Sequence, residues 1–208
     1  MNPASINPAL IYLGQTIYIA VSLYVLLIFI RVLLTWVNPN PYSPVMRFLA
    51  KATDPVLNWA RRFFPLTLGG LDFSPVLAIM VIYLTGAVLG QWLLRMGQGL
   101  PPVVVVPILA LELIGFLDGL AWLLIILMGI RFIIALVQPS PYNILVRIIY
   151  GLTEPLLSPL RRFFPPLGRG MDLRPLIFLL IVLLIQQAVL YPLARGAAVW
   201  MSGMFSAG

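Results

Sequence analysis

The sequence predicts an all-α membrane protein with four transmembrane helices in two parallel two-helix repeats, each with an interfacial amphipathic helical loop. Three observations lead to this fold class. The chain is 62% hydrophobic and only 9% charged, whereas soluble domains are about half apolar and a quarter charged. Four apolar stretches reach the ~20 residues that a helix needs to cross a hydrocarbon core. A segment also recurs a hundred residues further along, which indicates one structural unit used twice.

The repeated segment runs over residues 31–75 and again over 131–175, with 17 identities in 45 positions and no gap. The shared residues keep one order: an arginine, Pro-x-Pro-Tyr, Thr-(Asp/Glu)-Pro, Arg-Arg-Phe-Phe-Pro and Gly-x-Asp-x-x-Pro. We therefore divide the chain into a first repeat at 1–96, a Gly/Pro-rich linker at 97–107 and a second repeat at 108–208.

The four spans are expected at about residues 12–37, 75–94, 109–137 and 175–193. All four are predicted to be helices, because backbone groups in lipid must be hydrogen-bonded within their own segment. Each repeat holds two spans, so both copies have the same orientation in the membrane. We expect a pseudo-two-fold axis along the membrane normal to relate them.

The loop inside each repeat has the pattern of short helices that lie at the membrane surface. Residues 43–52 suit an amphipathic helix, and Thr53-Asp54-Pro55 predicts a stop and a restart with proline at the first helical position. The aromatic residues are expected to face the acyl chains and the arginines the phosphates. In the second copy, Pro159 is expected to shorten the interfacial helix.

Basic residues are concentrated in the two repeated loops. Because basic loops stay cytoplasmic, both repeated loops are predicted to face the cytoplasm and both termini the other side of the membrane. The loop cations are candidate contacts for lipid headgroups or a partner: Arg47, Lys51, Arg61, Arg62, Arg147, Arg161 and Arg162.

Each repeat places an arginine inside the end of its first span. Arg31 and Arg131 lie eight residues before a proline, on the order of 10 Å inside the helix end. One interpretation is that they snorkel to the interface. The other is that each pairs with an acid of its own loop, since charges within membranes usually have a partner. The candidate pairs are Arg31 with Asp54 or Asp72, and Arg131 with Glu154 or Asp172.

Acids within the spans occur only in the third span. Glu112 is expected at the outer interface, whereas Asp118 lies deeper and is a candidate ion or proton site. Gln186 and Gln187, in the middle of the fourth span, are expected to form hydrogen bonds between helices.

These motifs resemble the YggT family, called YlmG in Gram-positive bacteria, cyanobacteria and plastids. The resemblance covers roughly residues 15–95 and 115–195, including the glycine-rich turn at 69–75 and the central motif at 154–162. Departures from the family pattern, such as Trp59 and Arg174, suggest that the two copies have divided their roles. Two-copy members are typical of proteobacterial inner membranes. The resemblance implies connections with osmotic or salt tolerance and ion uptake, and in other lineages with cell division, nucleoid or plastid organisation and cytochrome b6 haem assembly.

The composition argues against an enzyme. The chain has no histidine and no cysteine, which excludes imidazole or thiolate metal sites and a cysteine nucleophile. It also has no Gly-x-Gly-x-x-Gly or Walker-type loop, so no cofactor is expected. The pI of 10.3 comes from cations beside aromatic residues in two interfacial loops. Anionic lipid headgroups are therefore the expected partners rather than nucleic acid, together with other membrane proteins or a second copy.

The expected function is that of a non-catalytic inner-membrane scaffold or accessory and assembly subunit, linked to envelope or osmotic stress. The alternative is an ion conductor or transporter component in osmotic or ion homeostasis. A conductor needs a polar file through the spans, and the spans offer only Asp118, the two arginines and the glutamines.

Overall fold

A computed structural model, which describes residues 6–37, 43–63, 67–68, 71–72, 74–137, 143–162 and 172–206, is almost entirely helical. Four helical stretches are long and apolar enough to cross a membrane, and the predicted fold class is confirmed. The first three are α1 (Pro8–Val37), α3 (Ser74–Gly97) and α4 (Val105–Val137). The fourth consists of α6 (Arg174–Ile185), the π-helical segment η4 (Gln186–Leu190) and α7 (Tyr191–Ser206).

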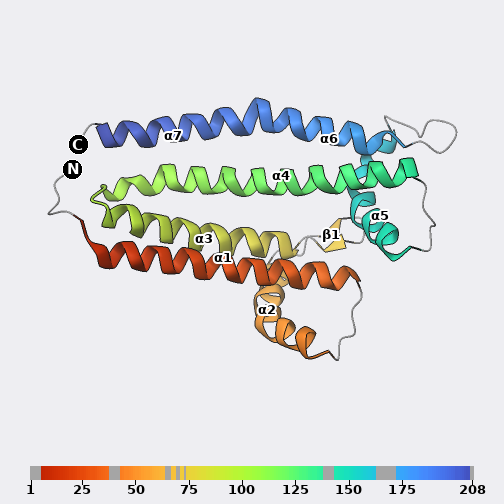
Figure 1. Ribbon diagram of the computed structural model, residues 1–208, viewed down its shortest axis with the longest axis horizontal. Coiled ribbons are helices and arrows are strands. Elements are labelled where there is room, and N and C mark those ends of the chain that lie inside the picture. The colour runs from red at the N-terminus through yellow and green to blue at the C-terminus, as the bar shows by residue number, and fades with distance from the viewer. Residues whose placement is uncertain are drawn as a thin grey trace.

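The four spans lie side by side in a row (Figure 1). α1 packs on α3, α3 on α4, and α4 on α6 and α7. A two-fold axis would exchange α1 with α4 and α3 with α6. The contact between α3 and α4 would then recur between α6 and α1, but the described residues form no comparable contact between α6 and α1. The expected pseudo-two-fold arrangement is therefore wrong. The connection between α3 and α4 is short, so α4 packs directly on α3. Because α1 already covers one side of α3, α4 lies on another side. The two repeats therefore follow one another along the row.

Two shorter helices turn across the row at the end opposite to the start of α1 and the end of α7 (Figure 1). α2 (Pro44–Phe63) connects α1 to the second span, and α5 (Ile144–Leu157) follows α4. α5 gives way to the 3-10 helix η3 (Ser158–Arg162). This change confirms the shortening expected from Pro159, which has no N–H to continue the α-helical hydrogen bonds. Both interfacial helices lie at the same end, as parallel repeats require.

α2 continues without a break through Pro55, so the predicted stop and restart is wrong. Proline leaves the carbonyl of Lys51 without its helical donor. Both residues are on the exposed face of α2, where water or lipid headgroups can solvate that carbonyl. On the other face, buried Thr53 and Leu57 hold the two halves of the helix in place. α5 passes through Pro155 in the same way.

A short β-ribbon lies between α2 and α3, which the sequence analysis did not predict. β1 (Thr67–Leu68) pairs antiparallel with β2 (Leu71–Asp72). The two residues between these strands are glycines in the sequence, the composition that two-residue hairpin loops favour. Strands of two residues are too short to show the alternation of apolar and polar residues that predicts a strand. In the sequence, only the glycine pair indicates this ribbon.

The third span begins earlier than residue 109. Gly99, with a φ of 85°, lets the chain reverse after α3, and the 3-10 turn η2 (Pro102–Val104) leads into α4 at Val105. Pro107 lies in the first turn of α4, where a missing N–H costs nothing because it has no acceptor within the helix. Proline is therefore compatible with this early start.

The fourth span contains a π-helical turn just before Pro192. Inside an α-helix, a proline removes one hydrogen bond and its ring clashes with the carbonyl four residues earlier. A wider turn upstream relieves that clash, and π-turns inside long helices are such local adjustments. Pro192 explains why this span is interrupted at η4.

α1 and α3 approach so closely that their backbones touch at glycines. A Cβ added to Gly14 would lie 2.5 Å from the carbonyl oxygen of Gly90, and one added to Gly90 would lie 2.8 Å from that of Gly14. Small residues allow such contact between transmembrane helices. The second repeat has Ile114 and Leu190 at the matching positions, so its spans are held together in another way.

Gly90→Ala is expected to destabilise the protein by about 1–3 kcal/mol, because the added methyl group must push two backbones apart. Gly129→Ala is the matched control, since a Cβ there meets nothing within 4 Å and alanine has the same helical advantage in both variants. Thermal unfolding in detergent measures the difference. Equal stability of the two variants would contradict the close α1–α3 contact.

Candidate functional site

The most polar buried site lies where α4, α5 and the start of α6 meet. Arg131 is only 2% exposed and lies in α4, six residues before the helix ends at Val137. Its Nη2 lies 2.5 Å from Glu154 Oε2 and 3.8 Å from Asp172 Oδ2. Its Nη1 donates to Thr153 Oγ1 at 2.6 Å. One guanidinium therefore connects α4 to α5 and to the start of the fourth span.

Tyr150 and Thr153 fix the orientation of this guanidinium. The Cζ of Arg131 lies 4.4 Å from the centroid of the Tyr150 ring, within the range of a cation–π interaction. Arg131 Nη1 also donates to the Tyr150 carbonyl at 3.3 Å. The Thr153 hydroxyl donates its own proton to the Ile149 carbonyl at 2.5 Å, so its oxygen is available as an acceptor for Arg131.

Asp172 brings a second arginine into the site. Arg174 Nε and Nη2 each donate to one Asp172 oxygen at 2.7 Å, a bidentate geometry. The Arg174 backbone N–H also donates to Asp172 Oδ1 at 3.1 Å. Burial raises the pKa of Asp172, but the hydrogen bonds and charge of Arg174 outweigh it and hold this pKa below its ordinary value. Two cations and two carboxylates thus balance each other.

The first repeat has a more exposed version of the same site. Arg31 Nη2 lies 3.6 Å from Asp54 Oδ1, and the Arg31 side chain is 17% exposed against 2% for Arg131. Thr53, fully buried like its counterpart, donates to the Leu49 carbonyl at 2.8 Å. The side chain of Asp72 lies outside the described residues. The structure thus brings each intramembrane arginine to an acid of its own loop.

The two acids of α4 each bind a different neighbouring helix. The Tyr83 hydroxyl donates to Glu112 Oε2 at 2.7 Å, which joins α3 to α4 and hence one repeat to the other. Gln186 Nε2 donates to Asp118 Oδ1 at 2.8 Å, and Gln186 is 1% exposed. Gln187 is exposed, and its side chain makes no hydrogen bond in the described part of the chain. The expectation of an interhelical bond is therefore wrong for Gln187.

These two hydrogen bonds are separate features. Glu112 and Asp118 are six residues apart, about 9 Å along the helix, and each faces a neutral donor. Such pairs hold transmembrane helices together. Sequence reasoning did not consider Tyr83, because a single tyrosine in an apolar span carries no periodic signal.

α2 has three distinct faces. A buried face packs on α1 and α3; it consists of Met46, Leu49, Thr53, Leu57 and Ala60. A second face is apolar but exposed, and consists of Val45, Phe48, Trp59 and Phe63. The third face is basic and exposed, and consists of Arg47, Lys51, Arg61 and Arg62.

The basic residues predicted in the second loop are less fully described. Arg147 is exposed on α5, whereas the side chains of Arg161 and Arg162 lie outside the described residues. The second interfacial helix therefore shows a single exposed cation among its described side chains.

Comparison with known proteins finds one family over most of the chain. A family model described as CCB3/YggT matches residues 10–93 and, a second time, residues 110–193. An uncharacterized protein of Pseudomonas aeruginosa is 34% identical over 199 residues, which cover 96% of this chain and 94% of that protein. Uncharacterized protein YggT of Escherichia coli (strain K12) is 26% identical over 188 residues, 90% of this chain and 94% of that protein.

A plant protein shares a shorter segment. YlmG homolog protein 2, chloroplastic, of Arabidopsis thaliana is 39% identical over 61 residues, which cover 29% of this chain and 24% of that protein. No solved structure matches the chain.

Arg131→Ala is expected to destabilise the protein by about 3 kcal/mol, because it leaves Glu154, whose side chain is 34% exposed, without its cation, whereas Asp172 keeps its pair with Arg174. Combining it with Glu154→Gln should recover part of that loss, since the second change removes the unpaired charge. A double-mutant cycle by denaturant titration in detergent measures the coupling. Additive losses would show that Arg131 and Glu154 do not interact and would contradict the observed pair.

Proposed function

The chain belongs to the CCB3/YggT family, and we propose that it is a non-catalytic scaffold or accessory subunit of the bacterial inner membrane, linked to envelope or osmotic stress. The observation that carries this proposal is the three-faced α2 helix. One face is fixed to the transmembrane helices, and the other two are left exposed. An exposed apolar face beside a basic face is the surface that binds anionic membranes or membrane-bound partners.

The position of α2 supports an interfacial role. It turns across the direction of the long helices (Figure 1), so it lies along the membrane surface if those helices cross the membrane. The Tyr24 hydroxyl donates to the Ala52 carbonyl at 3.0 Å, and Arg31 pairs with Asp54. These contacts fix α2 to α1. Each Arg or Lys near an anionic surface contributes about 1 kcal/mol, so the four cations of the basic face together favour tight lipid contact.

An ion conductor is less well supported. The spans form a row in which the main contacts join only neighbouring helices, so one chain offers no common interior for a conduction path. The polar pairs Tyr83–Glu112 and Gln186–Asp118 lie on different helix pairs. A polar file of the kind that ion pathways use requires such groups to follow one another along one cavity.

We place both interfacial helices on the cytoplasmic side, with the termini outside. The repeated loops hold most of the basic residues, and the positive-inside rule favours that orientation. The common end occupied by α2 and α5 is consistent with it.

The proposed function predicts which variants rescue a strain that lacks this gene after hyperosmotic shock. Replacing Arg47, Lys51, Arg61 and Arg62 by glutamine should abolish rescue, because it removes the basic face. Asp118→Asn should rescue normally. Survival is measured at matched protein levels, with Arg195→Gln as an exposed-arginine control from α7. The opposite pattern, in which only Asp118→Asn fails, would contradict the scaffold and favour ion transport.

The proposed orientation is tested by thiol labelling. The chain has no cysteine, so only the introduced thiol can react. Ser43→Cys, Asn143→Cys and Gln98→Cys are exposed to a reagent that does not cross the inner membrane. Gln98→Cys should be labelled in intact cells, and the other two only after the membrane is permeabilised. Labelling of Ser43→Cys in intact cells would reverse the topology.

A further inference from the structure

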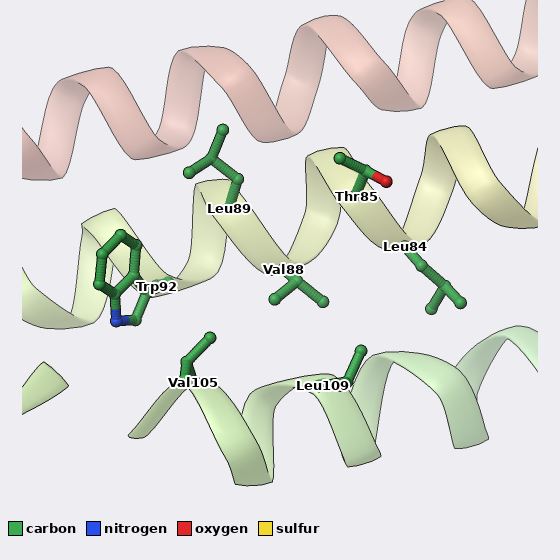
Figure 2. Close-up of a pocket in the computed structure, with 7 residues that line it drawn as sticks. All are labelled: Leu84, Thr85, Val88, Leu89, Trp92, Val105 and Leu109. Carbon is green, nitrogen blue, oxygen red and sulfur yellow. The ribbon is translucent and has the colours of Figure 1, made fainter. Parts of the chain in front are cut away.

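A groove of about 320 Å³ runs between α3 and α4, at the junction of the two repeats (Figure 2). Leu84 and Val88 project from α3 toward α4, and Val105 and Leu109 project from α4 toward α3; the Trp92 ring lies beside α3 and also lines the groove. Apart from the Thr85 hydroxyl and the Trp92 indole N–H, the side chains that line the groove are apolar. The volume lies at the lower end of the range for ligand pockets.

The groove lies within the candidate membrane spans rather than beyond their ends. Its residues belong to the second and third candidate spans, Ser74–Gly97 and Pro102–Val137. From Leu84 to Trp92 the groove follows eight residues of helix, roughly 12 Å. One leaflet contributes about half of the ~30 Å hydrocarbon core, so the groove has nearly the depth of one leaflet. An apolar groove of this length and depth fits a single lipid acyl chain.

The outer end of the groove has a fixed aromatic side chain. Trp92 Nε1 donates to the Pro102 carbonyl at 3.0 Å, and the indole packs on the small cluster of Leu100, Val104 and Ile108. Tryptophan is enriched where acyl chains meet headgroups. Trp92 therefore marks the level at which a bound lipid changes from chain to headgroup.

A cation lies one turn beyond that level. Arg95 follows Trp92 by three residues and Val88 by seven, spacings that place all three on one side of the helix, and it lies two residues before α3 ends at Gly97. In the described part of the chain no acid forms an ion pair with Arg95. Its charge is complementary to a phosphate at headgroup level.

We propose that this groove binds one acyl chain of an anionic glycerophospholipid from the leaflet on the side of the termini, with its phosphate at Arg95. The lipid fills the space between the two repeats and joins them in addition to the Tyr83–Glu112 hydrogen bond. This site is independent of the scaffold proposal, because the helix α2, which carries the basic face, lies toward the other end of the long helices.

Quenching of tryptophan fluorescence by brominated lipids tests the site. The chain has five tryptophans, and replacing the other four by phenylalanine leaves Trp92 as the reporter. In vesicles that contain either brominated phosphatidylglycerol or brominated phosphatidylcholine, Trp92 should report about fivefold tighter binding of the anionic lipid, the effect of one cation near a charged surface. A protein with only Trp122, which is exposed on α4, should report no preference.

Three substitutions at the groove in the Trp92-only protein separate the effect of charge from the effect of space, and a fourth, Arg147→Gln, is the control. Arg95→Gln should reduce the preference to about one, whereas Arg95→Lys, which keeps the charge, should retain it. Leu109→Phe, which fills the groove, should reduce quenching of Trp92 by both lipids. Arg147→Gln, at the other end of the molecule, should change nothing. Any one of three results would overturn the proposal. They are equal binding of both lipids at Trp92, a lipid preference that persists in Arg95→Gln, and quenching of Trp92 that Leu109→Phe does not change.

Discussion

The rest of the structure depends on the need to neutralise an arginine buried at the end of a membrane span. Arg131 is too deeply enclosed to be solvated by water, and an unpaired buried charge costs several kcal/mol. Its nearest carboxylate belongs to α5 and another to the start of the fourth span. The loop must therefore fold back onto α4, and this constraint explains why α5 lies against the spans.

The two repeats apply one plan with different contacts. In the first, Gly14 and Gly90 let α1 and α3 touch along their backbones, and the arginine site is partly exposed. In the second, larger residues keep α4 from such close contact, and the Asp118–Gln186 hydrogen bond joins the helices instead. The interfacial helices also differ between the repeats, because α2 is strongly basic and α5 is largely apolar. A duplicated unit has thus kept its arginine–carboxylate pair and changed its surfaces.

Composition and the internal repeat were sufficient to predict four spans, their parallel repeats and the acids that meet Arg31 and Arg131, because these features rest on long-range hydrophobicity and on the cost of unpaired charge. The order of helices in space was predicted wrongly, since either a two-fold or a tandem arrangement satisfies the same hydrophobic pattern. The sequence pattern predicts a break at Pro55, but α2 continues through it. Pro55 and Lys51 lie on the exposed face, where solvent can replace the hydrogen bond that proline removes. The π-turn at Gln186 has one signal in the sequence, the nearby Pro192, which does not by itself fix where the wider turn lies.

Hydrogen–deuterium exchange of the protein in lipid nanodiscs tests most directly whether Arg131 holds the interfacial helix against the spans. Arg131→Ala should speed exchange of the α5 amides by about 100-fold, the factor that corresponds to ~3 kcal/mol of lost pairing energy, while α1 and α3 exchange as in the unmodified protein. Exchange of α5 that is unchanged, or that rises equally in every helix, would contradict the claim that this one buried ion pair positions the loop.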